Sequence, residues 1–252
     1  MTSWLKANER IDDLQHNNLH IIQNPQAFRF GMDAVLLADF TRIRPRERIA
    51  DMGTGTGILA LLLSQKQTDC VIDAFEIQPA MADMASRSVH MNGLEERIRV
   101  HAADLRDAWR ILGRECLHAV ICNPPYGKRG ATLTSETDTI SIARHEDDTT
   151  IDEIVAACAS VLKNHGRLSM VFPAQRMLEL CDSMRKHRLE PKRIRMVCAH
   201  VDDPPYLVMV EAMKNAKPSL LWMAPLIVYQ ADGSETEEIK KIYHKSDDGS
   251  SI

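Results

Sequence analysis

The segment Asn123–Tyr126 combines residue types that can hold a planar amino group. Asn123 has a side-chain carbonyl, and Pro124 has a backbone carbonyl whose direction is restricted by the ring of Pro125 that follows. Two such acceptors can receive both hydrogens of one NH2 group. Tyr126 offers an aromatic face on which a base can stack, an interaction of roughly 1–3 kcal/mol per base. We therefore expect Asn123, Pro124, Pro125 and Tyr126 to be catalytic.

An amino group attached to a π system is a poor nucleophile because its lone pair is delocalised. Accepting hydrogen bonds from both of its hydrogens makes the nitrogen more tetrahedral and returns the lone pair to it. Placement lowers the barrier further, on the order of 7–11 kcal/mol when the reacting atoms are held in line. No strong general base is needed, since alkylation of the nitrogen acidifies its proton. Nucleobase amines and glutamine amides pose the same problem, so the tetrapeptide leaves both open.

A second candidate site is the glycine-rich segment 51–57, which reads DMGTGTG and follows an apolar run. Closely spaced glycines let backbone N–H groups approach a ligand without a Cβ in the way. A tight strand-to-helix turn also needs glycine for steric reasons alone. The spacing departs from the dinucleotide fingerprint G-x-G-x-x-G, and no Lys followed by Ser or Thr completes a P-loop. The segment therefore predicts a ligand loop that is not a phosphate cradle.

Three acidic residues end the first three predicted strands. Asp51, Glu76 and Asp104 each stand where an apolar run stops. Ligands of open α/β sheets bind outside the carboxyl ends of the strands, so these side chains should border one crevice, with Glu76 placed to accept hydrogen bonds from both hydroxyls of a ribose. An acidic crevice without a phosphate cradle suits a cationic nucleoside.

From residue 48 onward, short apolar runs alternate with longer segments of helical period, the pattern of parallel strands joined by crossover helices. The last two strands are separated only by 201–205, too short a link for a parallel crossover, so they should form an antiparallel hairpin at the sheet edge. The predicted fold is α/β and Rossmann-like, a seven-stranded, mostly parallel sheet with helices on both faces. Strands are expected at 48–52, 71–77, 97–104, 118–122, 166–172, 193–200 and 206–213, and helices near 57–65, 80–92, 151–163 and 174–188.

The chain divides into three parts around this sheet. Residues 1–47 are too few for a domain, and their amphipathic run 28–40 predicts a helix in an extension that packs over the ligand site. Residues 48–230 form the main domain. Residues 231–252 are charged and then rich in Ser and Gly, which predicts a partly disordered tail. The polar segment 127–149 reads as a long loop, and such loops often bind or cover ligands.

The formal net charge of -4 excludes a uniformly basic surface, so a polyanion would have to bind local Lys and Arg patches. The densest patch lies at 185–195, and two basic residues follow the catalytic segment closely. Alternatively, the patch and these two basic residues are simply solvated charges on helix and loop surfaces. The residues expected to contact nucleic acid on this basis are Lys128, Arg129, Arg185, Lys192 and Arg193.

Cysteine and histidine spacing predicts no metal site. The six cysteines are scattered without metal-ligand or redox spacing and read as reduced thiols, and the ten histidines show no pairing. No apolar run reaches membrane-spanning length, and the N-terminus does not resemble a signal peptide. We therefore expect a cytoplasmic protein that does not bind a membrane.

Four features together resemble the class I S-adenosylmethionine-dependent methyltransferases: the glycine loop, an acid after the second strand, Asp after the third and NPPY after the fourth. The resemblance covers about residues 28–230. It implies the class I methyltransferase fold, S-adenosylmethionine as cofactor and S-adenosylhomocysteine as product.

The same resemblance implies a role for each residue of the crevice. The glycine loop would hold the methionine part of the cofactor, Glu76 its ribose, and Asp104 with Ala103 its adenine, while Asp51 would orient the loop or reach the cofactor's amino group. The cofactor-binding residues expected on this basis are Asp51, Gly53, Gly55, Gly57, Glu76, Ala103 and Asp104.

Further stretches are similar to one subfamily, the bacterial valine-tRNA (adenine-N6)-methyltransferases, which modify the adenosine at tRNA position 37 beside the anticodon. This similarity implies methyl transfer to the exocyclic amine of an adenosine in RNA, with tRNA as the partner. We expect a monomer or a weak homodimer. The stretches are 28–40, 51–65, 76–98, 143–147 and 189–197.

Within these stretches, Phe30 and Asp33 match the segment that folds over the cofactor in such enzymes, and Arg144 and His145 match a loop that could contact the target nucleotide. The sequence departs from the subfamily directly after NPPY, where GKRG stands in place of the more common apolar or aromatic residue. That departure leaves the local geometry of base binding open.

Three alternatives remain at this point. A glutamine methyltransferase acting on peptide-release factors would use the same NPPY segment, but such enzymes carry an additional helical recruiting domain before the sheet, and only about 47 residues precede it here. A guanine-amine methyltransferase of ribosomal RNA is the second. A catalytically idle module that binds the cofactor is the non-enzyme alternative.

Overall fold

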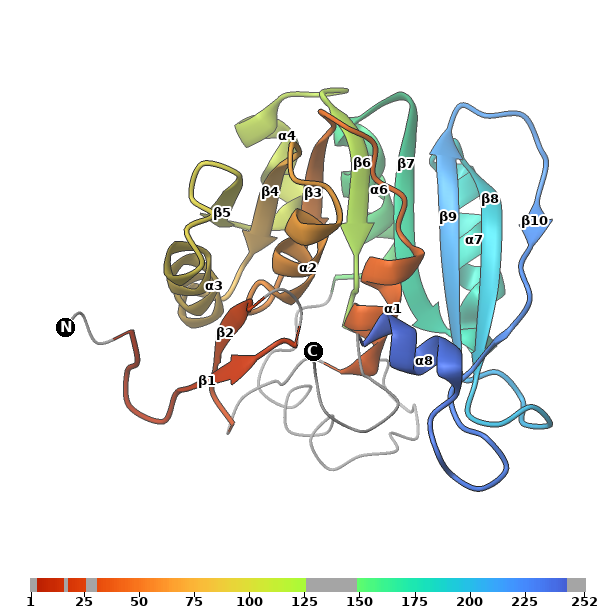
Figure 1. Cartoon of the computed structure of the whole chain (residues 1–252). Coiled ribbons are helices and arrows are strands. Elements are labelled where there is room, and N and C mark those ends of the chain that lie inside the picture. Colours follow the sequence, from red (N-terminus) through yellow and green to blue (C-terminus); the bar gives the residue numbers. More distant parts are fainter. Residues whose placement is uncertain (1–3, 16–17, 26–30, 126–148, 244–252) are drawn as a thin grey trace.

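A nine-stranded sheet forms the centre of the protein. The computed structural model describes residues 4–15, 18–25, 31–125 and 149–243. The strand order is β10-β8-β9-β7-β6-β3-β4-β5, and β11 pairs with β8 beside β10. Helices cover both faces, with α1 and α2 in front of the sheet and α6 and α7 behind it in Figure 1.

The elements follow the predicted alternation of strands and helices. The strands of the sheet are β3 (Arg48–Met52), β4 (Val71–Glu76), β5 (Ile98–Ala102), β6 (Leu117–Cys122), β7 (Leu162–Pro173), β8 (Leu189–Cys198), β9 (Leu207–Lys214), β10 (Leu221–Trp222) and β11 (Leu226–Ile227). The helices are α1 (Met32–Phe40), α2 (Ile58–Lys66), α3 (Pro79–Met91), α4 (Ala108–Leu112), α6 (Ile151–Val161), α7 (Met177–Lys186) and α8 (Glu237–Ile242), with short 3-10 turns η1 (Leu105–Asp107) and η2 (Ala174–Arg176).

The topology confirms the predicted mostly parallel sheet with an antiparallel hairpin. Strands β3 to β7 pair in parallel, while β9 runs antiparallel to both β7 and β8. The prediction of seven strands was incomplete, because β10 and β11 add to the outer side of β8 in parallel. Strand β8 also begins four residues earlier than expected, and its register shifts between Pro191 and Arg193, where proline cannot donate to the ladder.

Side chains alternate between two cores, one on each face of the sheet. Along β3, Ile49 packs in one buried cluster with residues of α1 and α2, whereas Ala50 packs in a second cluster with residues of α6 and α7. Because successive side chains of a strand point to opposite faces, Asp51 lies on the α1 side. Ile121, the partner of Asp51 on β6, belongs to the α1 cluster, so Asn123 beyond it lies on the α1 side as well.

The N-terminal extension holds more structure than the predicted helix. Strands β1 (Arg10–Asp13) and β2 (His20–Gln23) form a separate antiparallel ribbon. This ribbon lies against α3, where the backbone N–H of Ile22 donates to Ser88 Oγ at 2.9 Å. Arg87 of the same helix makes an ion pair with Glu9 at 2.7 Å. The helix expected at 28–40 is described from Met32 onward.

The C-terminal tail is also more ordered than predicted. Thr236 caps α8 by accepting from the N–H of Ile239, and Ile239 and Ile242 are buried beside α1. The segment 231–243 therefore includes a short packed helix, which the prediction of a charged tail did not contain. The ribbon, α1 and α8 all gather at the lower end of the sheet in Figure 1, where the parallel strands have their carboxyl ends.

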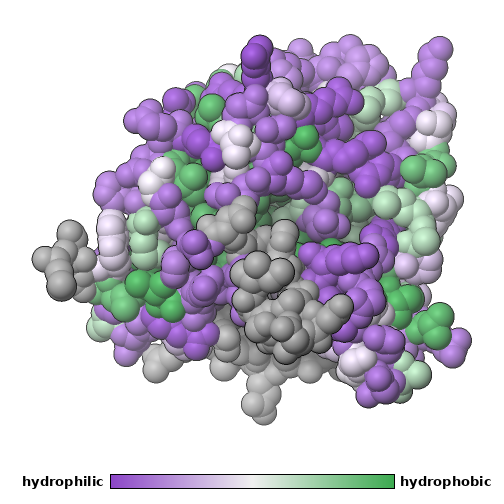
Figure 2. All heavy atoms as spheres, in the orientation of Figure 1, coloured by the Kyte–Doolittle hydropathy of each residue, from purple (hydrophilic) through white to green (hydrophobic). Residues whose placement is uncertain are grey.

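The surface is mainly polar on the face seen in Figure 2, where hydrophobic side chains form small separate groups. No helix among the described residues combines the length and the apolar character that crossing a membrane requires.

Candidate functional site

The glycine loop folds over the carboxyl end of β4. The backbone N–H groups of Gly53 and Thr54 both donate to the carbonyl of Phe75, at 2.9 and 2.8 Å. Gly53 has a φ of +81°, which favours glycine, and a Cβ there would meet none of the described residues within 4 Å. Gly57 differs, because a Cβ there would lie 3.3 Å from the Cβ of Ala85 in α3. Close packing of α2 on α3 therefore accounts for Gly57 without a ligand.

Glu76 ends β4 directly beside this loop and is buried. Its Oε2 accepts from the N–H of Gly55 at 2.9 Å, and its Oε1 accepts from the N–H of Gln78 at 2.9 Å. The carboxylate thus joins the loop after β3 to the turn after β4. Ala103 also connects to this residue, since its N–H donates to the Glu76 carbonyl at 3.0 Å.

Asp51 is a fully buried carboxyl that is only partly satisfied. Its Oδ2 accepts from the Thr54 hydroxyl at 2.5 Å, while its Oδ1 makes no hydrogen bond of normal geometry within the described part of the chain. Burial raises the pKa of Asp51 to about 7 and the nearby Glu76 adds to the shift, whereas the Thr54 hydroxyl and the backbone N–H of Ala60 oppose it. A cationic group beside Oδ1 would give this oxygen a partner and stabilise the ionised form of Asp51.

Asp104 follows β5 and caps the turn η1. Its Oδ1 accepts from the N–H of Arg106 at 2.8 Å, and its Oδ2 pairs with the Arg106 guanidinium at 2.6 Å. Burial alone would raise the pKa of Asp104, but the hydrogen bonds and charge of Arg106 outweigh it and lower the pKa. Arg106 was not among the predicted site residues, although its position two residues after a strand-ending Asp is the spacing of a local cap.

Asn123 stands beyond the tip of β6, with Pro124 buried and Pro125 exposed. Its side-chain Nδ2 donates to Oδ2 of Asp33, in the first turn of α1, at 3.0 Å. The Asp33 carboxylate, expected from the sequence to bind cofactor, therefore lies against the predicted catalytic residue.

A small cavity of about 40 Å³ shows which parts meet here. It lies where the glycine loop, α1, α2 and the tip of β6 meet. The lining residues are Ala34, Gly53, Thr54, Gly55, Thr56, Ile58, Leu59 and Asn123.

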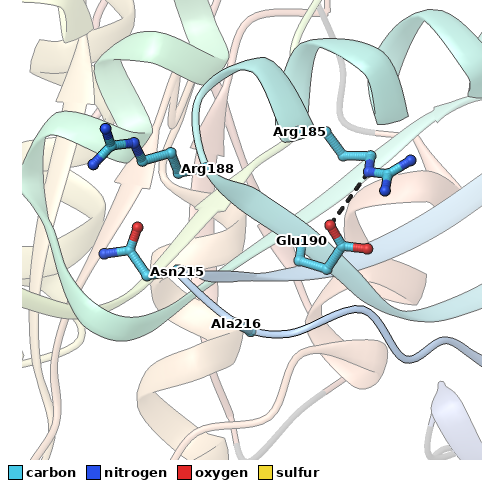
Figure 3. Close-up of a pocket in the computed structure, with 5 residues that line it drawn as sticks. All are labelled: Arg185, Arg188, Glu190, Asn215 and Ala216. Atoms are coloured by element: carbon cyan, nitrogen blue, oxygen red, sulfur yellow. Dashed lines mark hydrogen bonds and ion pairs between the residues drawn. The ribbon is translucent and has the colours of Figure 1, made fainter.

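The predicted basic patch at 185–195 does not belong to this junction. Strand β8 runs parallel to β6, so its start and the end of α7 lie at the amino ends of the strands, opposite Asn123. An open hollow of about 320 Å³ lies there, lined by Arg185, Arg188, Glu190, Asn215 and Ala216 (Figure 3). In this view Arg185 turns toward Glu190, with which it forms an exposed ion pair at 3.3 Å, and Arg188 lies across the hollow.

The other two residues of the patch that were predicted to contact nucleic acid, Lys192 and Arg193, are engaged within the protein. Arg193 is only 12% exposed, pairs with the buried Glu211 at 3.2 Å and stacks its guanidinium 4.5 Å from the ring of Phe40. Lys192 donates to Ser219 at 2.5 Å and to the carbonyl of Lys217 at 3.0 Å. The guanidinium of Arg193 is thus mostly covered and paired with a buried carboxylate, so a phosphate would have to compete with this packing.

Several predicted site residues lie outside the described part of the chain. They are Phe30, Tyr126, Lys128, Arg129, Arg144 and His145. Among residues 4–15, 18–25, 31–125 and 149–243, no group of three or more His, Cys, Asp and Glu side chains is arranged to hold a metal ion.

Comparison with known proteins places these features in a family. Residues 30–191 match the methyltransferase small domain family. The chain is 27% identical over 219 residues to the tRNA1(Val) (adenine(37)-N6)-methyltransferase of Haemophilus influenzae, across 86% of this chain and 90% of that one. It is 34% identical over 157 residues to the protein of the same name from Tolumonas auensis, across 62% of this chain and 64% of that one.

Solved structures agree on the fold. A predicted O-methyltransferase from Agrobacterium tumefaciens matches with a TM-score of 0.70 and 22% identity, over 84% of this chain and 96% of that one. The predicted class I methyltransferase fold and the resemblance stated from sequence motifs are both confirmed. Because the family match spans more than half of its length, the chain belongs to the methyltransferase small domain family.

Proposed function

We propose that the protein transfers a methyl group from S-adenosylmethionine to the exocyclic amine of an adenosine in tRNA, the adenosine at position 37 beside the anticodon of valine tRNA. The observation that carries this proposal is the shared cavity, in which Asn123 meets the glycine loop. The relatives from Haemophilus influenzae and Tolumonas auensis support the choice of acceptor through the reaction in their names.

The residues around the glycine loop fit a cationic nucleoside. Among the described residues, Asp51 offers a buried oxygen without a hydrogen-bond partner and no atom lies within 4 Å of the Cβ position of Gly53. Glu76 lies at the end of the neighbouring strand. We propose that Asp51, the loop 53–57, Glu76, Ala103 and Asp104 hold S-adenosylmethionine. When bound, the cofactor supplies a methyl group whose bond to a positively charged sulfur breaks, with the electron pair left on sulfur, as the amine nitrogen bonds to the methyl carbon.

The tip of β6 would hold the amine. Asn123 presents an amide and Pro124 a backbone carbonyl, and together they would accept both hydrogens of the NH2 group. Pro124 is buried, so its carbonyl is held by packing as well as by the ring of Pro125. The proton that the nitrogen loses after methylation would leave to solvent, which avoids the need for a buried base.

An adenosine in an anticodon loop suits this arrangement better than one in a duplex. Extruding a paired base costs a few kcal/mol, whereas a loop nucleotide is already unpaired. We propose that Tyr126 stacks on the base and that Lys128, Arg129, Arg144 and His145 contact the RNA near it. A tRNA substrate would place the protein in the cytoplasm, and the monomer or weak homodimer expected from the sequence stays a prediction.

The test is methyl transfer from labelled S-adenosylmethionine to three acceptors: an unmodified valine tRNA transcript, the same transcript with guanosine at position 37, and a peptide-release factor. We expect N6-methyladenosine in the first alone, identified by nucleoside mass spectrometry. Asn123→Ala should abolish transfer while cofactor affinity stays within about fivefold, since placement of the amine would be lost and the cofactor residues kept. Labelling of the release factor, or of the transcript lacking adenosine 37, would refute the proposed acceptor.

A further inference from the structure

Helix α1 brings a carboxylate to the amide of Asn123 from 90 residues away in the chain. We infer that Asp33 is a positioning residue of the site: it holds the Asn123 side chain with the nitrogen toward α1 and the carbonyl oxygen toward the amine to be methylated. This inference rests on the proposed function and deepens it, because it gives Asp33 a task at the acceptor rather than at the cofactor.

Each of the two oxygens of Asp33 accepts a hydrogen bond, an arrangement that a side-chain amide cannot reproduce. Oδ1 accepts from the backbone N–H of Ala34 at 2.9 Å, and Oδ2 accepts from Asn123 Nδ2 at 3.0 Å. A neutral amide of the same shape has one oxygen and one NH2 group, so it cannot accept both bonds. If the NH2 group of the introduced amide faced Asn123, the Asn123 side chain would rotate to present its oxygen to that group. The NH2 group of Asn123, a donor, would then face the substrate amine in place of the carbonyl oxygen.

The surroundings of Asp33 hold the carboxylate in this place. A Cβ on Gly31 would lie 2.7 Å from Asp33 Oδ1, so glycine before the helix leaves room for the carboxylate. The first turn of a helix favours negative charge through the aligned backbone dipoles. From Ala34 to Ala38 the helix is buried in the same cluster as α2, which gives the carboxylate a rigid base.

The charge of Asp33 acts on the acceptor through the amide as well. An amide whose NH2 group donates to a carboxylate is polarised, so its oxygen becomes a stronger acceptor. The substrate nitrogen gains positive charge as it bonds to carbon, and a stronger acceptor stabilises that charge more than it stabilises the neutral amine. Asp33 should therefore affect the rate of transfer more than the binding of either substrate.

The test compares Asp33→Asn and Asp33→Ala with Asp39→Asn, a matched change at an exposed position near the other end of α1. On valine tRNA we expect Asp33→Asn to lower kcat about 10- to 100-fold, or about 1.4–2.8 kcal/mol, with KM for tRNA and Kd for cofactor within about threefold. Asp39→Asn should change none of these.

A second measurement does not depend on turnover. The side-chain NH2 resonance of Asn123, identified in NMR spectra by its absence from Asn123→Ala, should change its chemical shift and exchange faster with solvent in Asp33→Ala. It should stay unchanged in Asp39→Asn. Asp33→Asn repeats the comparison if the alanine variant melts at a markedly lower temperature.

The outcomes separate this inference from the proposed function. An unchanged Asn123 resonance in the Asp33 variants would overturn the inference. So would a large loss of cofactor affinity at unchanged kcat, which would return Asp33 to cofactor binding. A wild-type protein that methylates no tRNA, yet shows the coupled resonances, would overturn the proposed function and leave the contact between Asp33 and Asn123 standing.

Discussion

The buried carboxyl of Asp51 predicts that stability falls as the pH rises, the reverse of the usual effect of a carboxylate. Burial raises the pKa of Asp51 to about 7 in the folded protein, against an ordinary value of 3.8. A raised folded-state pKa means that the folded protein binds this proton more tightly than the unfolded chain does. The contribution to stability is therefore fully present below about pH 3.8 and is lost as the pH rises through about 7.

The size of the effect follows from the two pKa values. The difference between about 7 and 3.8 corresponds, at 1.36 kcal/mol per pH unit, to about 4 kcal/mol. This is a large share of the stability of a domain, which is typically about 5–15 kcal/mol. Asp51→Asn keeps the size of the side chain and an acceptor for Thr54 but cannot ionise. The unfolding free energy of the variant relative to wild type should therefore rise by about 4 kcal/mol between pH 4 and pH 8.

Urea denaturation of wild type and Asp51→Asn at pH steps from about 3 to 8 measures this difference and also covers the acid range in which the control responds. The matched control is Asp73→Asn, a second buried carboxyl. Burial would raise the pKa of Asp73, but the hydrogen bond from His101 and the charge of Arg48 lower it below its usual value. Its contribution is thus present above pH 4 and lost in acid, so its pH dependence has the opposite sign. Parallel stability curves for wild type and Asp51→Asn from pH 5 to 8 would refute the reasoning.

Two further pairs of substitutions test the assignment of residues to packing rather than to ligands. Gly57→Ala should lower the unfolding free energy by about 1–3 kcal/mol in urea titrations, because its backbone has a φ of +97° and its Cβ would press on α3. The Cβ in Gly53→Ala would meet none of the described residues, so this change should lower stability less than Gly57→Ala does. It should weaken cofactor binding more than Gly57→Ala does. Arg193→Ala should cost about 2–3 kcal/mol by leaving the buried Glu211 with one guanidinium fewer, whereas Arg185→Ala should stay within about 1 kcal/mol. Weaker tRNA binding by Arg193→Ala at unchanged stability would contradict this assignment.

The parallel sheet was predictable because its central strands are apolar runs buried on both faces and bounded by polar residues. Strands β10 and β11 were not, since each has two residues and pairs only because β8 is already in place. Helix α8 was missed for a similar reason. Its six residues read as a charged tail, and only the fold shows Ile239 and Ile242 buried beside α1.

In the candidate site too, the sequence predicts where residues stand along the chain but not which side chains meet. Chain position alone places Asp51, Glu76 and Asn123 at strand ends, and the structure has them there. The partner of each polar atom depends on tertiary structure: no local pattern links Asp33 to Asn123. Arg193 illustrates the converse, because a run of basic residues reads as one patch until a strand turns one of its members inward.

Several carboxylates border the site, and the positions of three of them match the movement of positive charge in the proposed reaction. Methyl transfer from a sulfonium to an amine moves one positive charge from sulfur to nitrogen. Asp51 and Glu76 border the glycine loop, while Asp33 contacts Asn123, so negative charge lies at both ends of that path. The same carboxylates would repel an anionic ligand. The phosphates of an RNA substrate must therefore bind outside this ring, and Lys128 and Arg129, which follow the catalytic segment in the chain, are the first basic residues available to do so.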